Sequence, residues 1–321
     1  MTAIRFNRGE HVKKGLVLAF GSYIAWGFLS IFWKLLSGVD AYEVFSYRML
    51  STMLTMLLYF LLFGKMDKLK TEVSGLIANN SELVTMILAS FLISVNWLVF
   101  IYAVGHQQAT AASLGYYINP LFSVLLAVVF LKERLENFTK LSLVLALIGV
   151  LILTIQGGRL PIVSILLPLS FGTYGLIKKN VTLSSDVAMF VETIVVTPFV
   201  LVFILFFAKH APSDYTMSQI IYLILSGIIT AIPLLLFAEA LKQAPLNVVG
   251  FVQYVSPTIQ LAVAIFLFHE SFKLENLYGF TAIWLAIIVF VIGQVILMKK
   301  AKNMVNNSVV PLVQAIFYVI T

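Results

Sequence analysis

Residues 82–104 read ELVTMILASFLISVNWLVFIYAV, and Glu82 is the only charged residue in this stretch. As an α-helix, about 20 apolar residues cross the roughly 30 Å hydrocarbon core of a membrane. Similar stretches recur along the chain, separated by glycine, proline or polar residues that favour turns. We therefore predict an all-α integral membrane protein with ten transmembrane helices. They are expected at residues 15–36, 44–63, 82–104, 109–131, 138–156, 161–179, 187–208, 218–241, 245–268 and 276–298.

The composition supports this prediction. Of the 321 residues, 61% are hydrophobic and 11% are charged, whereas about 25% of the residues of a soluble domain are charged. The net charge is +7, but the basic residues lie in short loops, where they set topology rather than bind nucleic acid. The chain has no cysteine, which excludes disulfides, thiolate metal sites and cysteine nucleophiles. We expect neither a cofactor nor a metal site.

The loops indicate how the chain is oriented. Most lysines and arginines fall in loops on the same side as the N-terminus, such as those around Arg5, Lys65 and Lys132. Cytoplasmic loops hold an excess of basic residues, so both termini are predicted to be cytoplasmic, in a cytoplasmic (inner) membrane. The predicted layout is a cytoplasmic N-terminus at 1–14, five-helix halves at 15–156 and 157–299, and a cytoplasmic tail at 300–321 whose apolar run, Val309–Ile320, is too short to span.

The two halves resemble each other. Tyr117, Pro120 and Glu133 recur 137 positions later as Tyr254, Pro257 and Glu270, and the motif Ser22-Tyr23-x-x-Trp26-Gly27 recurs as Ser170-Phe171-x-x-Tyr174-Gly175. A five-helix unit crosses the membrane an odd number of times, so its second copy must enter from the opposite side. The prediction is therefore a pair of inverted repeats, an architecture that builds many secondary transporters.

Several motifs resemble those of one family. The chain is similar to the drug/metabolite transporter superfamily, and within it to the EamA-type permeases of the RarD-like group, over about residues 15–298. The resemblance implies ten helices and transport of amino acids, metabolites or drugs. The motifs that carry it are Tyr23-x-x-Trp26-Gly27, Asp40-Ala41-x-Glu43, Tyr47-Arg48, Asn96-Trp97, Ser113-Leu114-Gly115-Tyr116-Tyr117-Ile118-Asn119-Pro120, Phe171-x-x-Tyr174-Gly175, Glu192, Pro233-Leu234 and Gln253-Tyr254-x-x-Pro257.

Two charged residues fall inside predicted spans, where charges mark functional sites by default. Arg48 and Glu192 occupy nearly matched positions of the two repeats, but their helices enter from opposite sides. We therefore expect no ion pair between them. Arg48 is predicted to bind anionic groups toward the outside, and Glu192 to serve cations or protons toward the inside. Snorkelling of Arg48 to the interface and a structural, hydrogen-bonded role for Glu192 are the alternatives.

Aromatic and amide side chains add candidates for a solute cavity. Helix packing explains such residues about as often as ligand contact does. Lys34 and Lys178 are expected to anchor helix ends at the interface, and Glu239 to pair with Lys242 at the surface. The candidate substrate-binding residues are Tyr23, Trp26, Arg48, Asn96, Trp97, Tyr117, Asn119, Tyr174, Glu192, Gln253 and Tyr254.

These features favour a secondary-active transporter, expected to be an exporter of small organic solutes by alternating access. No phosphate-binding loop for direct use of ATP is present, so a proton or counter-solute gradient would supply the energy. An intramembrane enzyme is less favoured, since the second histidine of a zinc-protease helix does not follow His269-Glu270. A non-transporting sensor or scaffold is the third alternative.

Overall fold

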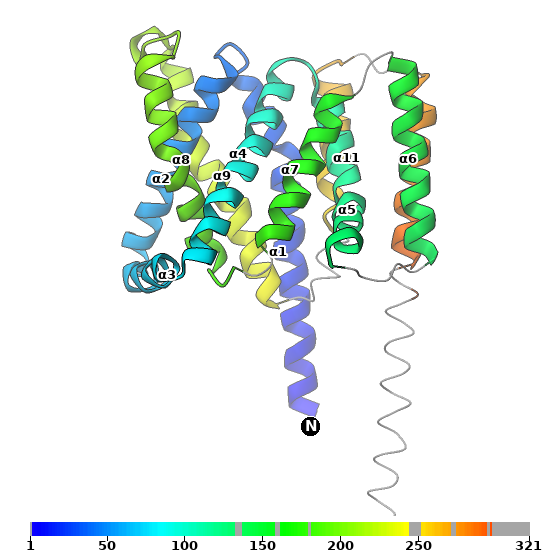
Figure 1. Cartoon of the computed structure of the whole chain (residues 1–321), viewed down its shortest axis with the longest axis horizontal. Coiled ribbons are helices and arrows are strands. Elements are labelled where there is room, and N and C mark those ends of the chain that lie inside the picture. The colour runs from blue at the N-terminus through cyan, green and yellow to red at the C-terminus, as the bar shows by residue number, and fades with distance from the viewer. Residues whose placement is uncertain are drawn as a thin grey trace, which may run out of the picture. The chain divides into compact units, whose positions relative to one another are not determined.

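The computed structural model describes residues 2–131, 137–157, 161–178, 181–243, 252–270, 274–293 and 296 (Figure 1). Within these ranges the chain contains helices, turns and short connections but no strand, which confirms the all-α prediction. The helices are α1 (Thr2–Leu35), α2 (Ala41–Leu62), α3 (Met66–Ala78), α4 (Asn80–Gly105), α5 (Ala109–Leu131), α6 (Asn137–Gly157), α7 (Ile162–Lys178), α8 (Ser185–Phe206), η1 (Pro212–Asp214), α9 (Met217–Gln243), α11 (Val255–Ala262), η2 (Val263–Leu267) and a helix at Asn276–Gly293.

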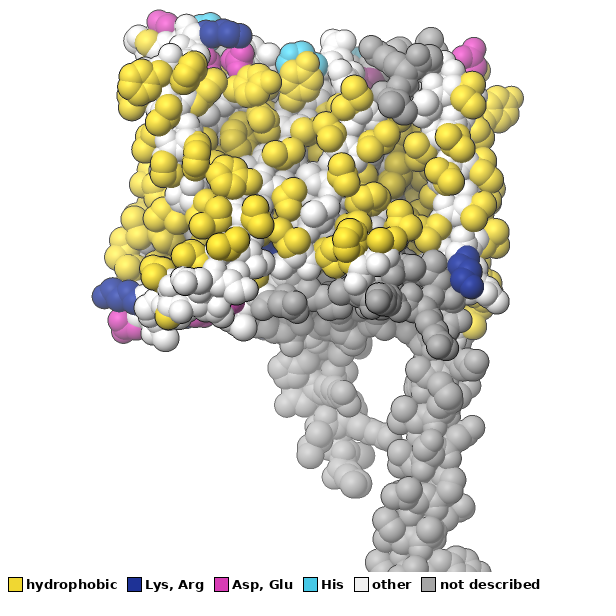
Figure 2. Space-filling view, in the orientation of Figure 1, with side chains coloured by type: hydrophobic (Ala, Val, Ile, Leu, Met, Phe, Trp, Pro, Cys, Tyr) yellow, Lys and Arg dark blue, Asp and Glu magenta, His cyan; other side chains and the backbone are white. Residues whose placement is uncertain are grey.

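The long helices have the length and composition of membrane spans. Seven helical segments among the described residues meet both criteria, and two shorter apolar segments, Ile162–Lys178 and Val255–Leu267, accompany them. Apolar side chains cover the flank seen in Figure 2, and the charged side chains visible there gather near its two ends. The protein is therefore a multi-pass membrane protein. That it has ten spans in two inverted repeats remains a prediction.

The structure corrects several predicted boundaries. The segment after Lys65, interpreted as a loop, is the amphipathic helix α3, which buries Leu69 and Leu76 on one face. Helix α1 begins at Thr2, within the segment expected to precede the first span, and its apolar part, Lys14–Leu35, agrees with the span predicted at 15–36. The predictions for residues 245–251, Glu133, the side chains of Pro120 and Lys242, and the 300–321 tail lie outside what the structure describes.

The chain divides into two compact units. Unit 1 contains Met1–Ala127 and Pro161–Phe272, and unit 2 contains Val128–Leu160 and Lys273–Thr321. In unit 2, α6 packs closely on the helix at Asn276–Gly293. A Cβ atom added to Gly149 would lie 2.6 Å from Ile283 Cγ1, and one added to Gly279 would lie 2.4 Å from Leu153 Cγ. Glycine is needed at both positions because the two backbones approach so closely.

Within unit 1, helices of the first half pack mainly on helices of the second half. The first helix of each half packs on the long third span of the other, as α1 on α9 and α7 on α4. The second spans, α2 and α8, pack on each other. Ser22 Oγ donates to the Pro233 carbonyl oxygen at 2.7 Å, and Asn96 Nδ2 donates to Ser170 Oγ at 3.1 Å. Asn96 and Pro233 are 137 positions apart, the offset of the predicted repeat, and Ser22 corresponds to Ser170, so the two contacts join positions that this repeat predicts to be equivalent.

Candidate functional site

Arg48 lies inside unit 1 among four helices. It is on the second turn of α2 and is 3% exposed. Its Nε donates to Thr230 Oγ1 of α9 at 3.1 Å. The guanidinium carbon, Cζ, lies 4.4 Å from the ring centroid of Trp97 on α4 and 5.0 Å from that of Trp33 on α1. The two indoles attract the cation through their π faces, so Arg48 is held by helices from both halves.

Arg48 has no acidic partner among the described residues, where no Asp or Glu forms an ion pair with it. A guanidinium carries five N–H donors and no acceptor, and the bond to Thr230 uses one of them. A buried charge is costly unless it is paired or binds a ligand. Its position inside the protein contradicts the snorkelling alternative. The arrangement suits the binding of an anionic ligand, which would accept hydrogen bonds from the guanidinium.

The amide of Asn96 serves mainly to join helices. Its Nδ2 donates to the Leu167 carbonyl oxygen at 2.9 Å as well as to Ser170 Oγ, both on α7. Its Oδ1 accepts from Tyr116 OH at 3.4 Å. Asn119, one turn beyond Tyr116 on α5, is 2% exposed, and its Oδ1 has no partner among the described residues. Asn119 is therefore the better of the two amides for contact with a solute.

The predicted aromatic residues divide into two groups. Tyr23 and Trp26 pack against other rings, whereas Tyr117 and Tyr254 are distinguished by their hydroxyl groups. Tyr23 and Trp26 of α1 pack edge to face at 5.3 Å between ring centroids, and both contact Phe237 of α9. Tyr117 OH donates to Thr258 Oγ1 at 2.8 Å, which joins α5 to α11. Tyr254 is half-buried, and its buried hydroxyl has no partner within the described ranges. Gln253 lies in the turn before α11.

Glu192 of α8 has partners of its own, apart from Arg48. It is 3% exposed and accepts from Tyr174 OH of α7 at 2.7 Å and from Lys178 Nζ. Lys178 Nζ also donates to Tyr174 OH at 2.5 Å. The expected interfacial anchoring of Lys178 is therefore corrected, since this lysine turns inward to a buried carboxylate. These bonds agree with the structural alternative for Glu192; its role toward cations or protons stays a prediction.

Sequence reasoning missed the role of Glu43, which is completely buried in the first turn of α2. Its carboxylate accepts from the backbone N–H groups of Lys209 and His210 at 2.7 and 3.2 Å and from Tyr215 OH at 2.7 Å. His210 Nδ1 lies 3.1 Å from it. Glu43 therefore ties α2 to the connection between α8 and α9. The motif containing Glu43 was visible in the sequence, but its partners lie more than 160 residues away.

At the other end of unit 1, acidic side chains hold the connection between α7 and α8. Glu72 accepts from the Ser184 backbone N–H at 2.8 Å, and Glu82 accepts from the Thr182 backbone N–H at 2.6 Å. Lys68 Nζ pairs with Asp186 Oδ1 at 2.6 Å. Both ends of unit 1 are thus tied by carboxylates of the first half to a connection in the second half.

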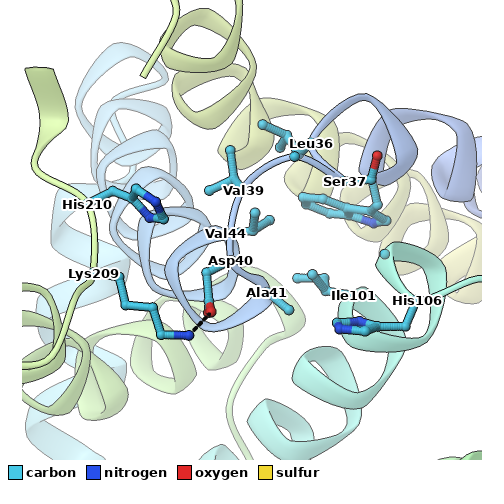
Figure 3. Close-up of a pocket in the computed structure, with 13 residues that line it drawn as sticks. Leu36, Ser37, Val39, Asp40, Ala41, Val44, Ile101, His106, Lys209 and His210 are labelled. Atoms are coloured by element: carbon cyan, nitrogen blue, oxygen red, sulfur yellow. Dashed lines mark hydrogen bonds and ion pairs between the residues drawn. The ribbon is translucent and has the colours of Figure 1, made fainter. Parts of the chain in front are cut away.

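A cavity of about 310 Å³ opens at the end of unit 1 that carries Asp40, which we call the Asp40 end (Figure 3). Lys209 Nζ donates to Asp40 Oδ2 at 3.0 Å on its rim. Burial raises the pKa of Asp40, but hydrogen bonds from Lys209 and the Tyr42 backbone outweigh it, so the pKa lies below its ordinary value. The lining residues are Trp33, Leu36, Ser37, Gly38, Val39, Asp40, Ala41, Val44, Ile101, Gly105, His106, Lys209 and His210.

One family model matches the chain twice. The family described as the EamA-like transporter family matches residues 13–155 and again residues 160–292. This chain belongs to the EamA-like transporter family. The two matches together cover most of the chain.

Relatives of this EamA-like protein carry transporter names. The chain is 38% identical over 292 residues to the uncharacterized transporter YojE of Bacillus subtilis (strain 168), covering 91% of this chain and 98% of that protein. It is 31% identical over 297 residues to the protein RarD of Escherichia coli (strain K12), covering 92% and 99%. These similarities confirm the resemblance to the RarD-like group.

A solved structure shares the fold. Its title reads only "Crystal structure of protein", and it matches with a TM-score of 0.56 and 14% sequence identity, covering 86% of this chain and 96% of that chain. At this identity the likeness shows the fold alone.

Proposed function

We propose that this EamA-like protein is a secondary-active transporter of the cytoplasmic membrane that exports small organic solutes bearing an anionic group. The observation that carries this proposal is the buried guanidinium of Arg48, which rests between two indoles and has no acidic partner in the described structure. Family membership and the relatives' names support the transport of a small solute. Both termini are proposed to be cytoplasmic, which places the Asp40 end outside.

The position of Arg48 suits alternating access. Trp33, Arg48 and Trp97 belong to the first half, and Thr230 belongs to the second. Inverted-repeat transporters place the solute site between the halves and expose it to each side in turn as one half rocks against the other. An anion bound at Arg48 would therefore sit where the two halves move relative to each other.

The remaining candidates extend the proposed site. Asn119 and Tyr254 supply buried polar atoms without a partner in the described ranges, and Tyr23 and Trp26 supply an aromatic wall. Glu192, with Tyr174 and Lys178, is proposed to respond to a proton or counter-solute, because its carboxylate joins α7 to α8 within the second half. A change in that ion pair would alter how these two helices pack.

The test is solute flux in proteoliposomes. Metabolites retained by cells with and without the protein are compared, and the solutes that differ are assayed after reconstitution. We expect Arg48→Gln to reduce the flux of an anionic solute about a hundredfold, because a charge-assisted bidentate contact is lost. Lys140→Gln removes a charge from an exposed position of α6 and serves as the matched control.

The outcomes separate the three functional classes. Flux that depends on Arg48 supports the transporter. Unchanged flux in Arg48→Gln would contradict the assigned site. Absence of flux for every candidate solute would favour a sensor or scaffold, and conversion of a solute to a product would favour an enzyme.

A further inference from the structure

Trp33 links the cavity at the Asp40 end to the Arg48 site. Its side chain forms part of the cavity wall, and its ring centroid lies 5.0 Å from Arg48 Cζ. The residue itself is only 2% exposed, so the indole is a buried neighbour of both the cavity and the guanidinium. A solute that moves between the Asp40 end and Arg48 by this route must displace the ring of Trp33.

The indole of Trp33 also has a free hydrogen-bond donor. Its Nε1 is buried and has no partner among the described residues. An indole N–H only donates, and a buried donor without an acceptor loses about 1–3 kcal/mol. Movement of the ring would break no hydrogen bond of this group, and an arriving acceptor would satisfy it. Trp33 and Arg48 are thus adjacent donors that both lack an anionic acceptor.

We propose that this cavity is the antechamber of the transport path, that it admits small monocarboxylates with an apolar body, and that Trp33 is both its inner gate and a specificity-determining residue. The inference rests on the proposed function and adds to it a solute class, a route and a residue. In this arrangement the carboxylate binds between the Arg48 guanidinium and the Trp33 N–H, and the apolar body of the solute lies on the side of the cavity.

The lining explains the choice of solute. Leu36, Val39, Val44 and Ile101 give the cavity apolar walls, as Figure 3 shows in part. A volume of about 310 Å³ is at the small end of the range of ligand sites. Lys209 offers a positive charge at the rim, while Asp40 beside it disfavours solutes with several negative charges. The single guanidinium of Arg48, beyond the ring of Trp33, suits a solute that carries a single carboxylate.

The first experiment uses the absence of native cysteine. Ser37→Cys places a single thiol on the cavity wall, and Ser213→Cys places one on exposed η1 outside it. Modification of the Ser37→Cys variant with a bulky sulfonate reagent is expected to reduce flux at least tenfold, and 3-phenylpropanoate should slow the modification. The same reagent should not reduce the flux of the Ser213→Cys variant, and 3-phenylpropanoate should not slow the modification of its thiol. Full flux after complete modification at position 37 would overturn the antechamber.

The second experiment tests Trp33 by binding to the full-length protein in detergent. The probes are 3-phenylpropanoate and its neutral counterpart, 3-phenylpropanamide. Trp33→Phe replaces the indole with a smaller aromatic ring that has no N–H, and should weaken carboxylate binding about tenfold. Trp284→Phe, in unit 2, is the matched control. Equal binding of acid and amide to the unaltered protein, or unchanged carboxylate binding in Trp33→Phe, would overturn the assignment.

The two proposals fail separately. If Arg48→Gln retains flux and carboxylate binding, the assigned site of the proposed function fails. If Arg48→Gln loses both while Trp33→Phe and modified Ser37→Cys remain normal, Arg48 still carries the solute and only the antechamber and gate fail.

Discussion

Arg48 and Glu192 are equally buried charges in one compact unit, each 3% exposed, but their surroundings differ. Glu192 holds Lys178 and Tyr174 at hydrogen-bonding distance. Arg48 has two indole faces and one hydroxyl. Glu43 resembles Glu192 in that several donors surround its carboxylate. The difference shows that burial alone does not identify a binding residue. What distinguishes Arg48 is that most of its N–H donors have no hydrogen-bond acceptor among the described residues.

The largest effect that the comparison predicts is on stability, at Glu43. Glu43→Ala leaves the Tyr215 hydroxyl and the backbone N–H groups of Lys209 and His210 without their acceptor, which should lower the free energy of unfolding by about 3 kcal/mol. Titration with SDS in mixed micelles measures this change. Glu275→Ala, at an exposed position, is the control. If Glu43→Ala lowered the free energy of unfolding no more than the control does, the hydrogen bonds of Glu43 would not stabilise the packing of α2.

Replacement of Glu192 should lower the free energy of unfolding less than replacement of Glu43 does. A second replacement, at Lys178, should restore most of the loss. Glu192→Gln leaves the Lys178 ammonium without its ion pair and should cost about 2 kcal/mol of unfolding free energy. Adding Lys178→Met to this variant should restore most of the loss, because no unpaired charge then remains. A double-mutant cycle by the same titration gives the coupling energy. Additive losses would mean that the two side chains do not interact as described.

Replacement of Arg48 should increase the free energy of unfolding, in contrast to replacement of Glu43 or Glu192. Arg48→Met removes a buried charge that has no acidic partner in the described structure, so it should raise the unfolding free energy by about 1 kcal/mol while solute flux is lost. A variant that gains stability and loses function would separate a binding residue from a structural one. If Arg48→Met instead destabilises the protein as much as Glu192→Gln does, Arg48 is a packing residue and the comparison fails.

The smallest effect is expected at the exposed pair of Asp40 and Lys209. Because the pKa of Asp40 lies below its ordinary value of about 3.9, the pair stabilises the folded state above that pH and loses this contribution as the pH falls through the folded-state pKa. Lys209→Met should therefore slightly lower the melting temperature at pH 7, and the difference should shrink as the pH falls through the folded-state pKa of Asp40. A difference that stays constant down to the acid end of the titration would assign the effect to packing of the lysine side chain.

Features set by local composition could be predicted from the sequence. Apolar length identified the long helices, and repeated residues such as Tyr117 and Tyr254 indicated two halves. The amphipathic α3 was missed because its basic residues, Lys68 and Lys70, were interpreted only as a loop signal. Its apolar positions, Leu69 and Leu76, carried a weak sign of the helix.

Long-range partners could not be predicted. Arg48 and Glu192 stood out because a charge inside a span is visible in one stretch of sequence. Their environments were not visible, since Thr230 is 182 residues from Arg48 and no local pattern links them. Lys178 illustrates the limit, because a lysine that ends a helix has the same sequence signal whether it faces lipid headgroups or a buried carboxylate.

The exchange of contacts between the halves also determines when the protein can fold. The Ser22 hydroxyl bonds to a carbonyl 211 residues later, and Glu43 receives donors 166 and 167 residues later. While the ribosome is still making the second half, α1 and α2 are already in the bilayer without their main packing partners. These two helices are therefore made before the residues they pack against, and Glu43 is made before its hydrogen-bond donors. Final assembly then follows synthesis, so a chain that stops before residue 209 leaves the Glu43 carboxylate without these donors and the Ser22 hydroxyl without its acceptor.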